Sequence, residues 1–262
     1  MKQNNDFLFR NAEGKKQILQ IIFEDTDLLV LNKPAGLRVL PDRWNEDLLN
    51  VYDLFNRGPS GVAENSEQKI WIVHRIDAGT SGLLICARNP ESHRIFNQSF
   101  AEGNIQKTYL AVVKGCPSPA EGKIDFPLLL TSQGRVKLSS QGKSALTHYR
   151  VAERFRHFSL LEVFPQTGRM HQIRVHLQAI GHPLAVDPKY GGANDIKITD
   201  LKKMPFRIED EGSSLISRLT LHAWKLKINH PIQQQAMEFE AEIPKDFSAL
   251  LKSLRKWDRL NA

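Results

Sequence analysis

Short apolar runs separated by turn-forming residues dominate the chain, and this pattern predicts many β-strands and few helices. Two early runs, ILQIIFED and LLVLNKPAG, are rich in strand-forming residues and end at turn residues. Two more, IWIV and LLICA, enclose a polar segment. The later candidate strands are KTYLAVVKG, ALTHYRVAERF, FSLLEVFP and RLTLHAWKLKINHP.

Helical spacing occurs in three segments. NPESHRIFNQSFAEGN is expected to begin with Asn89 as N-cap and Pro90 in its first turn, and to end at Gly103. TGRMHQIRVHLQAIGHP is the clearest helix, with Thr167 as the expected N-cap and residues 181–183 closing it. Its core face consists of Met170, Ile173, Leu177 and Ile180. A short amphipathic helix is expected in PKDFSALLKSLRKW.

These elements do not alternate regularly between strand and helix, so we expect a mixed α/β domain with many strands and few helices. The 262 residues suffice for one large domain or for a domain with two lobes. We predict a polar N-terminal tail over residues 1–16 and a single domain over residues 17–262. Residues 192–214 are polar and without periodicity, which predicts a loop or an insertion.

Composition narrows the class of protein. No window approaches the ~18 uninterrupted apolar residues of a membrane span. The N-terminus also has no apolar signal-peptide segment, so we expect a cytoplasmic protein. Cys86 and Cys116 are too few for a disulfide framework or a zinc site. The net charge of +7 fits either a lysine-rich surface or a polyanionic partner such as RNA or DNA, and charge alone does not decide between them.

Several common chemistries lack their motifs. The sequence contains no P-loop, no G-x-G-x-x-G dinucleotide motif and no G-x-S-x-G nucleophile motif. The zinc deaminase pattern is absent too. His171 and His176 are five positions apart, which is not the H-E-x-x-H spacing of zinc proteases. Metal-dependent and cofactor-dependent chemistries therefore have little support in these motifs.

The polar segment HRIDAGTSG carries more chemistry than a turn needs, because a plain turn requires only turn-forming residues. It places His74, Arg75 and Asp77 on a connection where a rigid scaffold commonly holds functional groups. A carboxylate near apolar walls has its pKa raised by desolvation unless a cation or hydrogen bonds keep it ionised. The alternative is that Asp77 only caps its own turn together with Thr80 and Ser81.

A second constellation lies on the helix expected from Arg169. His171, Arg174 and Gln178 share one stripe beside the core face, and a polar stripe at the edge of a core would line a groove. Arg169 would oppose the helix dipole in the first turn, and a bound anion such as a phosphate would remove that conflict. The alternative is that these are solvated charges on a helix surface.

These segments resemble the motifs of the RluA-type RNA pseudouridine synthases. HRIDAGTSG is similar to their H-R-L-D-x-x-T-S-G motif, and QTGRMHQIRVHLQAIGHPLAVDPKYGG is similar to their T-G-R-x-H-Q-I-R-x-H helix and the loop after it. KTYLAVVKG, LTLHAWKLKINHP and LLVLNKPAGL resemble three shorter family segments. The five segments follow the family order over residues 17–245. The most specific are HRIDAGTSG and QTGRMHQIRVHLQAIGHPLAVDPKYGG.

The resemblance implies an α+β fold, with a mixed, mostly antiparallel sheet of pseudouridine synthase type, flanking helices and two lobes around a central cleft. It also implies roles for particular residues. Asp77 would be the catalytic aspartate, Arg174 its basic partner and Tyr109 the aromatic residue that faces the uracil. Arg75 would help hold the flipped-out nucleotide or its phosphate, and His74, on the same loop, is a candidate substrate-binding residue. The further candidate substrate-binding residues are Thr80, Ser81, Arg169 and His171.

The family needs no metal or organic cofactor, which agrees with the missing cofactor motifs. Two positions depart from its pattern. Ile76 replaces the usual leucine, and Val186 stands where the family commonly has glycine before Asp187.

We therefore expect an RNA pseudouridine synthase that isomerises a flipped-out uridine in a structured stem-loop of ribosomal or transfer RNA. Sixteen residues precede Gln17, so we expect no N-terminal S4-like module, and we expect a monomer. Two other functions remain open. One is a non-catalytic RNA-binding module on the same scaffold, and the other is a nucleosidase-type hydrolase that uses Asp77.

Overall fold

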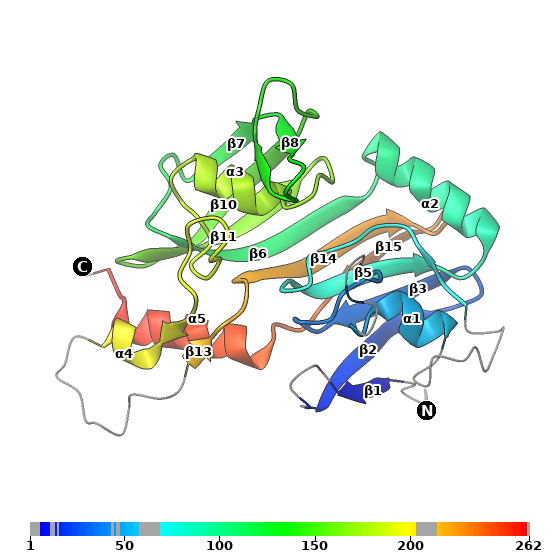
Figure 1. Cartoon of the computed structure of the whole chain (residues 1–262), viewed down its shortest axis with the longest axis horizontal. Helices are drawn as coiled ribbons and strands as arrows, with labels where there is room; N and C mark the ends of the chain where they lie inside the picture. Colours follow the sequence, from blue (N-terminus) through cyan, green and yellow to red (C-terminus); the bar gives the residue numbers. More distant parts are fainter. Residues whose placement is uncertain are drawn as a thin grey trace. The chain divides into compact units, whose positions relative to one another are not determined.

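The computed structural model describes residues 6–10, 14, 16–42, 45, 48–57, 69–202 and 214–260. The chain divides into two compact units, each built from two separate stretches of sequence (Figure 1). Unit 1 comprises residues 1–107 and 223–242, and unit 2 comprises residues 108–222 and 243–262. Among the described helices, none has both the length and the apolar character needed to cross a membrane.

Unit 1 is built on a sheet with the strand order β1-β2-β3-β5-β14, in which β4 also pairs with β5 and β15 with β14. The β1–β2, β2–β3, β3–β5, β4–β5 and β14–β15 pairs are antiparallel. Its strands are β1 (Phe7–Arg10), β2 (Lys16–Glu24), β3 (Leu28–Lys33), β4 (Trp71–Ile72), β5 (Ser81–Ala87), most of β14 (Leu221–Asn229) and β15 (Ala236–Glu240). Its helices are α1 (Val51–Asn56) and α2 (Pro90–Glu102). The centre of its core is β5, in which all seven residues are buried.

Unit 2 carries a second run of antiparallel strands in the order β6-β11-β10-β7. These are β6 (Gln106–Lys114), whose first two residues belong to unit 1, β7 (Glu121–Asp125), β10 (Leu146–Arg154) and β11 (Phe158–Pro165). Two small ladders join β8 (Leu128–Leu130) to β9 (Val136–Leu138) and β12 (Ile196–Lys197) to β13 (Ser214–Ile216). The helices are α3 (Gln172–Ala179), α4 (Ile198–Leu201) and α5 (Lys245–Trp257).

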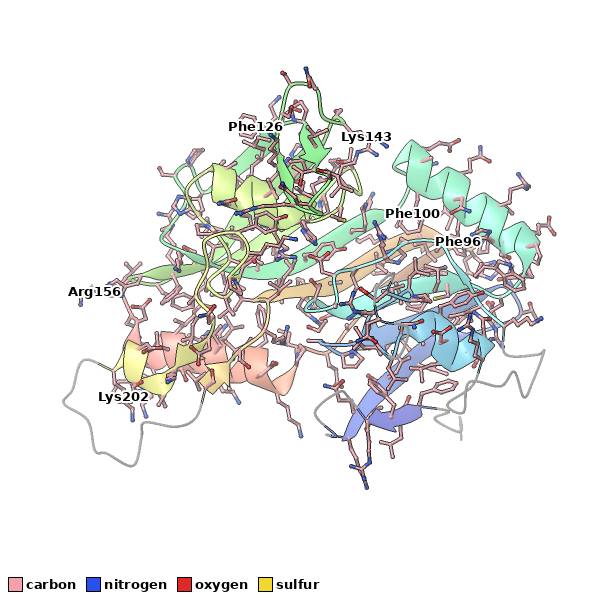
Figure 2. The ribbon with its side chains drawn as sticks, in the orientation of Figure 1. Phe96, Phe100, Phe126, Lys143, Arg156 and Lys202 are labelled. Carbon is pink, nitrogen blue, oxygen red and sulfur yellow. The ribbon has the colours of Figure 1, made fainter. Side chains whose placement is uncertain are left out.

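Helix α2 begins and ends as its sequence predicts. The Asn89 side chain accepts a hydrogen bond from the Ser92 backbone N–H, and Pro90 is the first helical residue. Gly103 ends the helix in the left-handed conformation, with φ of 76°. Phe96 and Phe100 extend from this helix (Figure 2), and Phe96 is buried in the core of unit 1.

The expected N-terminal tail is different in the structure, because its residues 7–10 form β1. This strand pairs with β2 from Phe7 opposite Leu19 to Arg10 opposite Lys16. The Phe7 ring lies 4.4 Å from that of Phe55, and Phe9 is buried. The apolar content of FLFR is too short to stand out between polar neighbours, so only the tertiary contacts reveal the strand.

The loop predicted over residues 192–214 is only partly correct. It contains β12, α4 and the first residue of β13, and residues 203–213 lie outside the described part of the chain. The strands expected on each side of the polar segment are confirmed as β4 and β5. The predicted mostly antiparallel α+β architecture is confirmed as well.

Gly82 shows why a small residue follows Thr80 and Ser81 in unit 1. Its φ is +110°, and a Cβ atom there would overlap the backbone carbonyl group of Ala223 in β14. Gly134, in the turn between β8 and β9, also has a positive φ of +72°, but nothing lies within 4 Å of the position its Cβ would take.

We predict that Gly82→Ala destabilises the protein more than Gly134→Ala. The Gly134 variant should cost about 1–2 kcal/mol of unfolding free energy, from the left-handed backbone alone. The Gly82 variant adds a collision with backbone in the middle of the sheet, where no flexible side chain can move aside. Urea unfolding of both variants measures the difference, and equal losses would contradict a close strand approach at Gly82.

Candidate active site

The polar segment forms a loop over residues 73–80 that joins β4 to β5. The two strands pair antiparallel, with Trp71 opposite Ala87 and Ile72 opposite Cys86, so both ends of the loop are fixed by paired strands, of which β5 is fully buried. Asp77 is partly buried, and a backbone hydrogen bond of 3.0 Å from Thr80 N to Asp77 O closes the turn. The turn is therefore held by the main chain at the residue that carries the candidate carboxylate.

Lys33 is the residue that anchors this loop. Its side chain is fully buried, and Nζ donates to the carbonyl oxygens of Pro34 at 2.9 Å, Leu37 at 2.7 Å and Ala78 at 3.2 Å. Gly36 N also donates to Ala78 O, at 2.7 Å. Charge-assisted hydrogen bonds to three carbonyls compensate the buried ammonium. The NKPAG turn thus clamps the residue next to Asp77, a role that the sequence analysis missed.

His74 is held as a neutral ring. Nε2 accepts a hydrogen bond of 2.9 Å from Ile85 N, which places the ring proton on Nδ1. The ring stacks on Phe100, with centroids 4.7 Å apart. Burial lowers the pKa of His74 to about 3, and the nearby charge of Lys107 adds to this effect. His74 can therefore donate a hydrogen bond from Nδ1, but it does not offer a cation near neutral pH.

The remaining candidates in the loop differ in exposure. Arg75 is exposed, and its guanidinium makes no hydrogen bond or ion pair with another described residue. Thr80 and Ser81 are both buried. Thr80 Oγ1 has no hydrogen-bond partner among the residues that the structure describes. Arg75 is thus available to a ligand, whereas substrate contacts by Thr80 and Ser81 stay predictions.

In unit 2, Tyr109 lies in β6 opposite Val163 of β11. It is partly buried and packs against a core cluster that includes Ile173 and Leu177 of α3. The strand and the helix therefore fix the position of its ring. Its expected contact with a uracil ring stays a prediction.

Arg174 of α3 is held by a buried carboxylate within unit 2. Its Nε and Nη2 atoms donate to Asp187 Oδ2 at 2.7 Å and Oδ1 at 2.8 Å. The Asp187 side chain is fully buried and that of Arg174 is 8% exposed. Lys189 N adds a donor to Asp187 at 3.2 Å, and the Tyr190 ring centroid lies 4.9 Å from the Arg174 guanidinium carbon. The expected pairing of Arg174 with Asp77 joins residues of the two units and stays a prediction.

The predicted start of α3 is wrong. The helix begins at Gln172, and the Gln172 side chain, not Thr167, organises the residues before it. Gln172 Oε1 accepts from Thr167 Oγ1 at 2.7 Å and from Arg169 N at 2.9 Å. Arg169 is exposed, lies before the helix and donates from Nε to Ser144 O. The argument that Arg169 opposes the helix dipole therefore fails, because Arg169 is not in the first turn.

His171 occupies the position before α3 in a left-handed conformation, with φ of 53°. Tyr190 explains how this backbone is held. Its hydroxyl accepts from Val136 N at 3.1 Å, which leaves its proton for His171 Nδ1 at 2.8 Å. His171 and Arg174 therefore share Tyr190 as a neighbour, whereas Gln178 of the same predicted stripe is exposed. A strained residue held so firmly is a feature of functional sites.

One group of side chains in the described residues has a spacing that could hold a metal ion. The ligand atoms of Asp25, Asp27 and His230 in unit 1 lie within 4.8 Å of one another. Asp25 accepts from Asp27 N, Leu28 N and His230 Nε2, at 2.8, 2.8 and 2.9 Å. These bonds close the turn between β2 and β3, so hydrogen bonding within the protein accounts for the group.

Comparison with known proteins gives a consistent result. Residues 27–179 match the family model described as RNA pseudouridylate synthase. The ribosomal large subunit pseudouridine synthase D of Zymomonas mobilis is 39% identical over 246 residues, covering 90% of this chain and 73% of that protein. The uncharacterized RNA pseudouridine synthase YlyB of Bacillus subtilis is 38% identical over 242 residues, covering 91% of this chain and 73% of that protein.

Solved structures share the fold. Human RNA pseudouridylate synthase domain containing 4 matches with a TM-score of 0.68 at 23% identity, covering 90% of this chain and 92% of that one. Human RNA pseudouridylate synthase domain containing 1 matches with a TM-score of 0.63 at 25% identity, covering 93% and 97%. The expected pseudouridine synthase type of sheet is thereby confirmed.

We predict that Asp187→Asn destabilises the protein by about 3–5 kcal/mol, because it removes the fully buried carboxylate charge that compensates the Arg174 guanidinium at two nitrogen atoms. The pair Glu153 and Arg255 is a matched control, since it is also bidentate but its side chains are 32% and 52% exposed. Glu153→Gln should cost less than about 1 kcal/mol. Urea unfolding measures both losses, and a small loss for Asp187→Asn would show that the Arg174 charge does not depend on Asp187.

A second prediction concerns pH. The folded protein holds His74 neutral with a lowered pKa, whereas the unfolded chain protonates it near pH 6.5. Stability contributed by the neutral ring is therefore complete above pH 6.5 and is lost as the pH falls toward 3. The loss should be on the order of 1 kcal/mol per pH unit. His74→Gln keeps an acceptor for Ile85 N and should show a shallower loss between pH 6.5 and 4.5; parallel stability curves would argue against a neutral buried His74.

Proposed function

The chain belongs to the RluA-type RNA pseudouridylate synthase family, and we propose that it isomerises uridines of large-subunit ribosomal RNA with Asp77 as its catalytic residue. As a member of that family it is an isomerase whose substrate is RNA. The substrate class in the proposal rests on the relatives named for the large ribosomal subunit. The single observation that supports Asp77 is the clamp from Lys33 and Gly36 on the neighbouring Ala78 carbonyl.

The proposed reaction requires one carboxylate and a closed pocket. Converting uridine to pseudouridine breaks the N–C glycosidic bond and forms a C–C bond to the same ring, without redox chemistry or net hydrolysis. An ionised Asp77 would act as nucleophile, or as base at the sugar, while the pocket retains the freed uracil. The carboxylate therefore has to be held in one position, which is what a turn closed by main-chain hydrogen bonds provides.

Arg174 and Tyr109 complete the proposed constellation. A guanidinium beside Asp77 would keep the carboxylate ionised in a partly dry site. Tyr109 would stack on the uracil, and its hydroxyl would reach the proton that leaves C5. Asp187 would act as a positioning residue, because it fixes the Arg174 side chain at both nitrogen atoms.

Binding has to extract the target uridine from structured RNA, at a cost of a few kcal/mol. Cationic side chains offset that cost through contacts with phosphates. Arg75 is suited to this, since it is exposed and has no partner among the described residues. Transfer RNA as an alternative substrate, a monomeric state and a cytoplasmic location stay predictions.

The decisive test is Asp77→Asn, which keeps the size and turn-forming capacity of the side chain but removes its charge. With a large-subunit ribosomal RNA transcript labelled with tritium at uridine C5, we expect the wild type to release tritium and the variant to release none. An asparagine amide cannot act as the nucleophile or the base, so turnover should stop. If Asp77 merely closed a turn, asparagine would replace it at little cost and turnover would continue.

Asp125→Asn is the matched control, because Asp125 is an exposed aspartate at the end of β7. It should turn over like the wild type. Thermal melts verify that both variants fold. Appreciable tritium release by well-folded Asp77→Asn would falsify the assignment, and free uracil as the wild-type product would identify a nucleosidase instead.

A further inference from the structure

Lys107 at the start of β6 has an unusual environment for a lysine. It is partly buried, and burial lowers its pKa. Within the described residues its ammonium makes no hydrogen bond and no ion pair. Its neighbours are the Phe100 ring, whose centroid lies 5.9 Å from Nζ, and His74, whose pKa its charge helps to lower.

Other lysines of unit 1 have partners that compensate their charge. The buried ammonium of Lys33 donates to three carbonyl oxygens. Lys225 and Lys227 of β14 form ion pairs of 3.0 and 3.1 Å with glutamates of β15. Lys107 alone in this comparison carries a desolvated charge that neither a carboxylate nor a carbonyl compensates. Such a group lowers stability unless a ligand supplies the missing anion.

His74 supplies a second donor next to the same ring. Its Nε2 is occupied by the hydrogen bond from Ile85 N, so Nδ1 carries the proton. Nδ1 has no acceptor among the residues that the structure describes. The ring lies flat against Phe100, which is labelled in Figure 2. Because the ring stays neutral, this N–H remains a donor over the whole physiological pH range.

Donors without acceptors define the chemistry of a ligand. Lys107, His74 and the neighbouring Arg75 offer an ammonium, an imidazole N–H and an exposed guanidinium, and none of the three has a carboxylate partner in the described parts of the chain. A ligand for this set is an anion with several acceptor oxygens. In a partly dry site its attraction to the ammonium is stronger than in water. A phosphodiester has one negative charge and two such oxygens.

We infer that Lys107 and His74 form a subsite, beside the Phe100 ring, for a backbone phosphate of the bound RNA. The inference rests on the proposed function for its ligand. His74 lies three positions before Asp77 in the same clamped loop. A phosphate held there would fix the RNA strand close to the nucleotide that reacts. Lys107 would then be a binding residue of unit 1, compensated only when RNA is present.

A structural role would have a different signature. If the face of the Phe100 ring were the partner that Lys107 needs, removing the ammonium would weaken the fold through the lost cation–π contact. If RNA supplies the partner, removing the ammonium relieves a desolvated charge in the free protein. Stability and RNA affinity would then change in opposite directions.

The experiment compares Lys107→Met with Lys16→Met, which removes an exposed lysine of β2 in the same unit. Filter binding of a large-subunit ribosomal RNA transcript is measured from 50 to 300 mM salt. Loss of one phosphate contact should lower the slope of log affinity against log salt by about 1 and weaken binding about 5- to 10-fold at 0.1 M salt. Lys107→Arg should keep the slope, since it keeps the charge.

The melting temperature of free Lys107→Met should equal or exceed that of the wild type. An unchanged salt slope in Lys107→Met, or a lowered melting temperature with normal RNA affinity, would overturn the subsite. Wild-type tritium release in the same RNA separates this failure from failure of the proposed function, because a turning-over wild type with an unchanged variant slope rejects only the subsite.

Discussion

The buried ammonium of Lys33 is the interaction on which the geometry of the Asp77 loop depends. A loop between two strands is normally the most mobile part of a sheet. Here one fully buried cation joins the NKPAG turn to the Ala78 carbonyl. Removing the ammonium would take the Lys33 donor away from the buried Leu37 carbonyl, so the clamp is strongly favoured once the surrounding strands have formed. The position of the candidate carboxylate is thus set by a residue 44 positions earlier in the chain.

Unit 2 fixes its own candidate cation by the complementary device. Arg174 is held at two nitrogen atoms by a fully buried carboxylate, that of Asp187. A bidentate pair leaves the guanidinium little rotational freedom, which a lysine would retain. In both units, then, a buried charge is compensated inside the protein and serves to position a side chain. Lys107 departs from this rule, and a desolvated charge without an internal counterpart among the described residues points to a ligand.

Local sequence signals predicted the elements whose ends are set by their own residues. Helix α2 is the clearest example, since Asn89 and Gly103 cap it through contacts within a few positions. The start of α3 was not predictable in that way. Thr167 has the chemistry of an N-cap, but its hydroxyl bonds to the Gln172 side chain, which also reaches Leu146 O and Thr147 Oγ1 in β10. The contacts of Gln172 with β10 therefore decided where α3 begins, and the sequence near Thr167 does not show them.

In the candidate site, too, the residues whose roles depend on tertiary contacts could not be predicted from the sequence. Asp77, Arg174 and Tyr109 could be named from motif letters, because the letters are specific. Lys33 and Asp187 could not, since their roles come from three carbonyls and one guanidinium that only the folded chain assembles. A lysine between an apolar strand and a proline was the one available signal for Lys33.

The polar loop combines groups that serve the fold with groups that serve the chemistry. His74 accepts from Ile85 N and so holds the loop against β5, and Thr80 is buried beside the turn. A histidine with a pKa of about 3 is not a general base or acid near neutral pH. In the proposed reaction, acid–base work in this loop would therefore fall to Asp77, and Arg75 would contact a phosphate of the RNA. In the proposed function, the imidazole thus fixes the loop through Nε2 and contacts the RNA through Nδ1, while the guanidinium and the carboxylate act on the RNA.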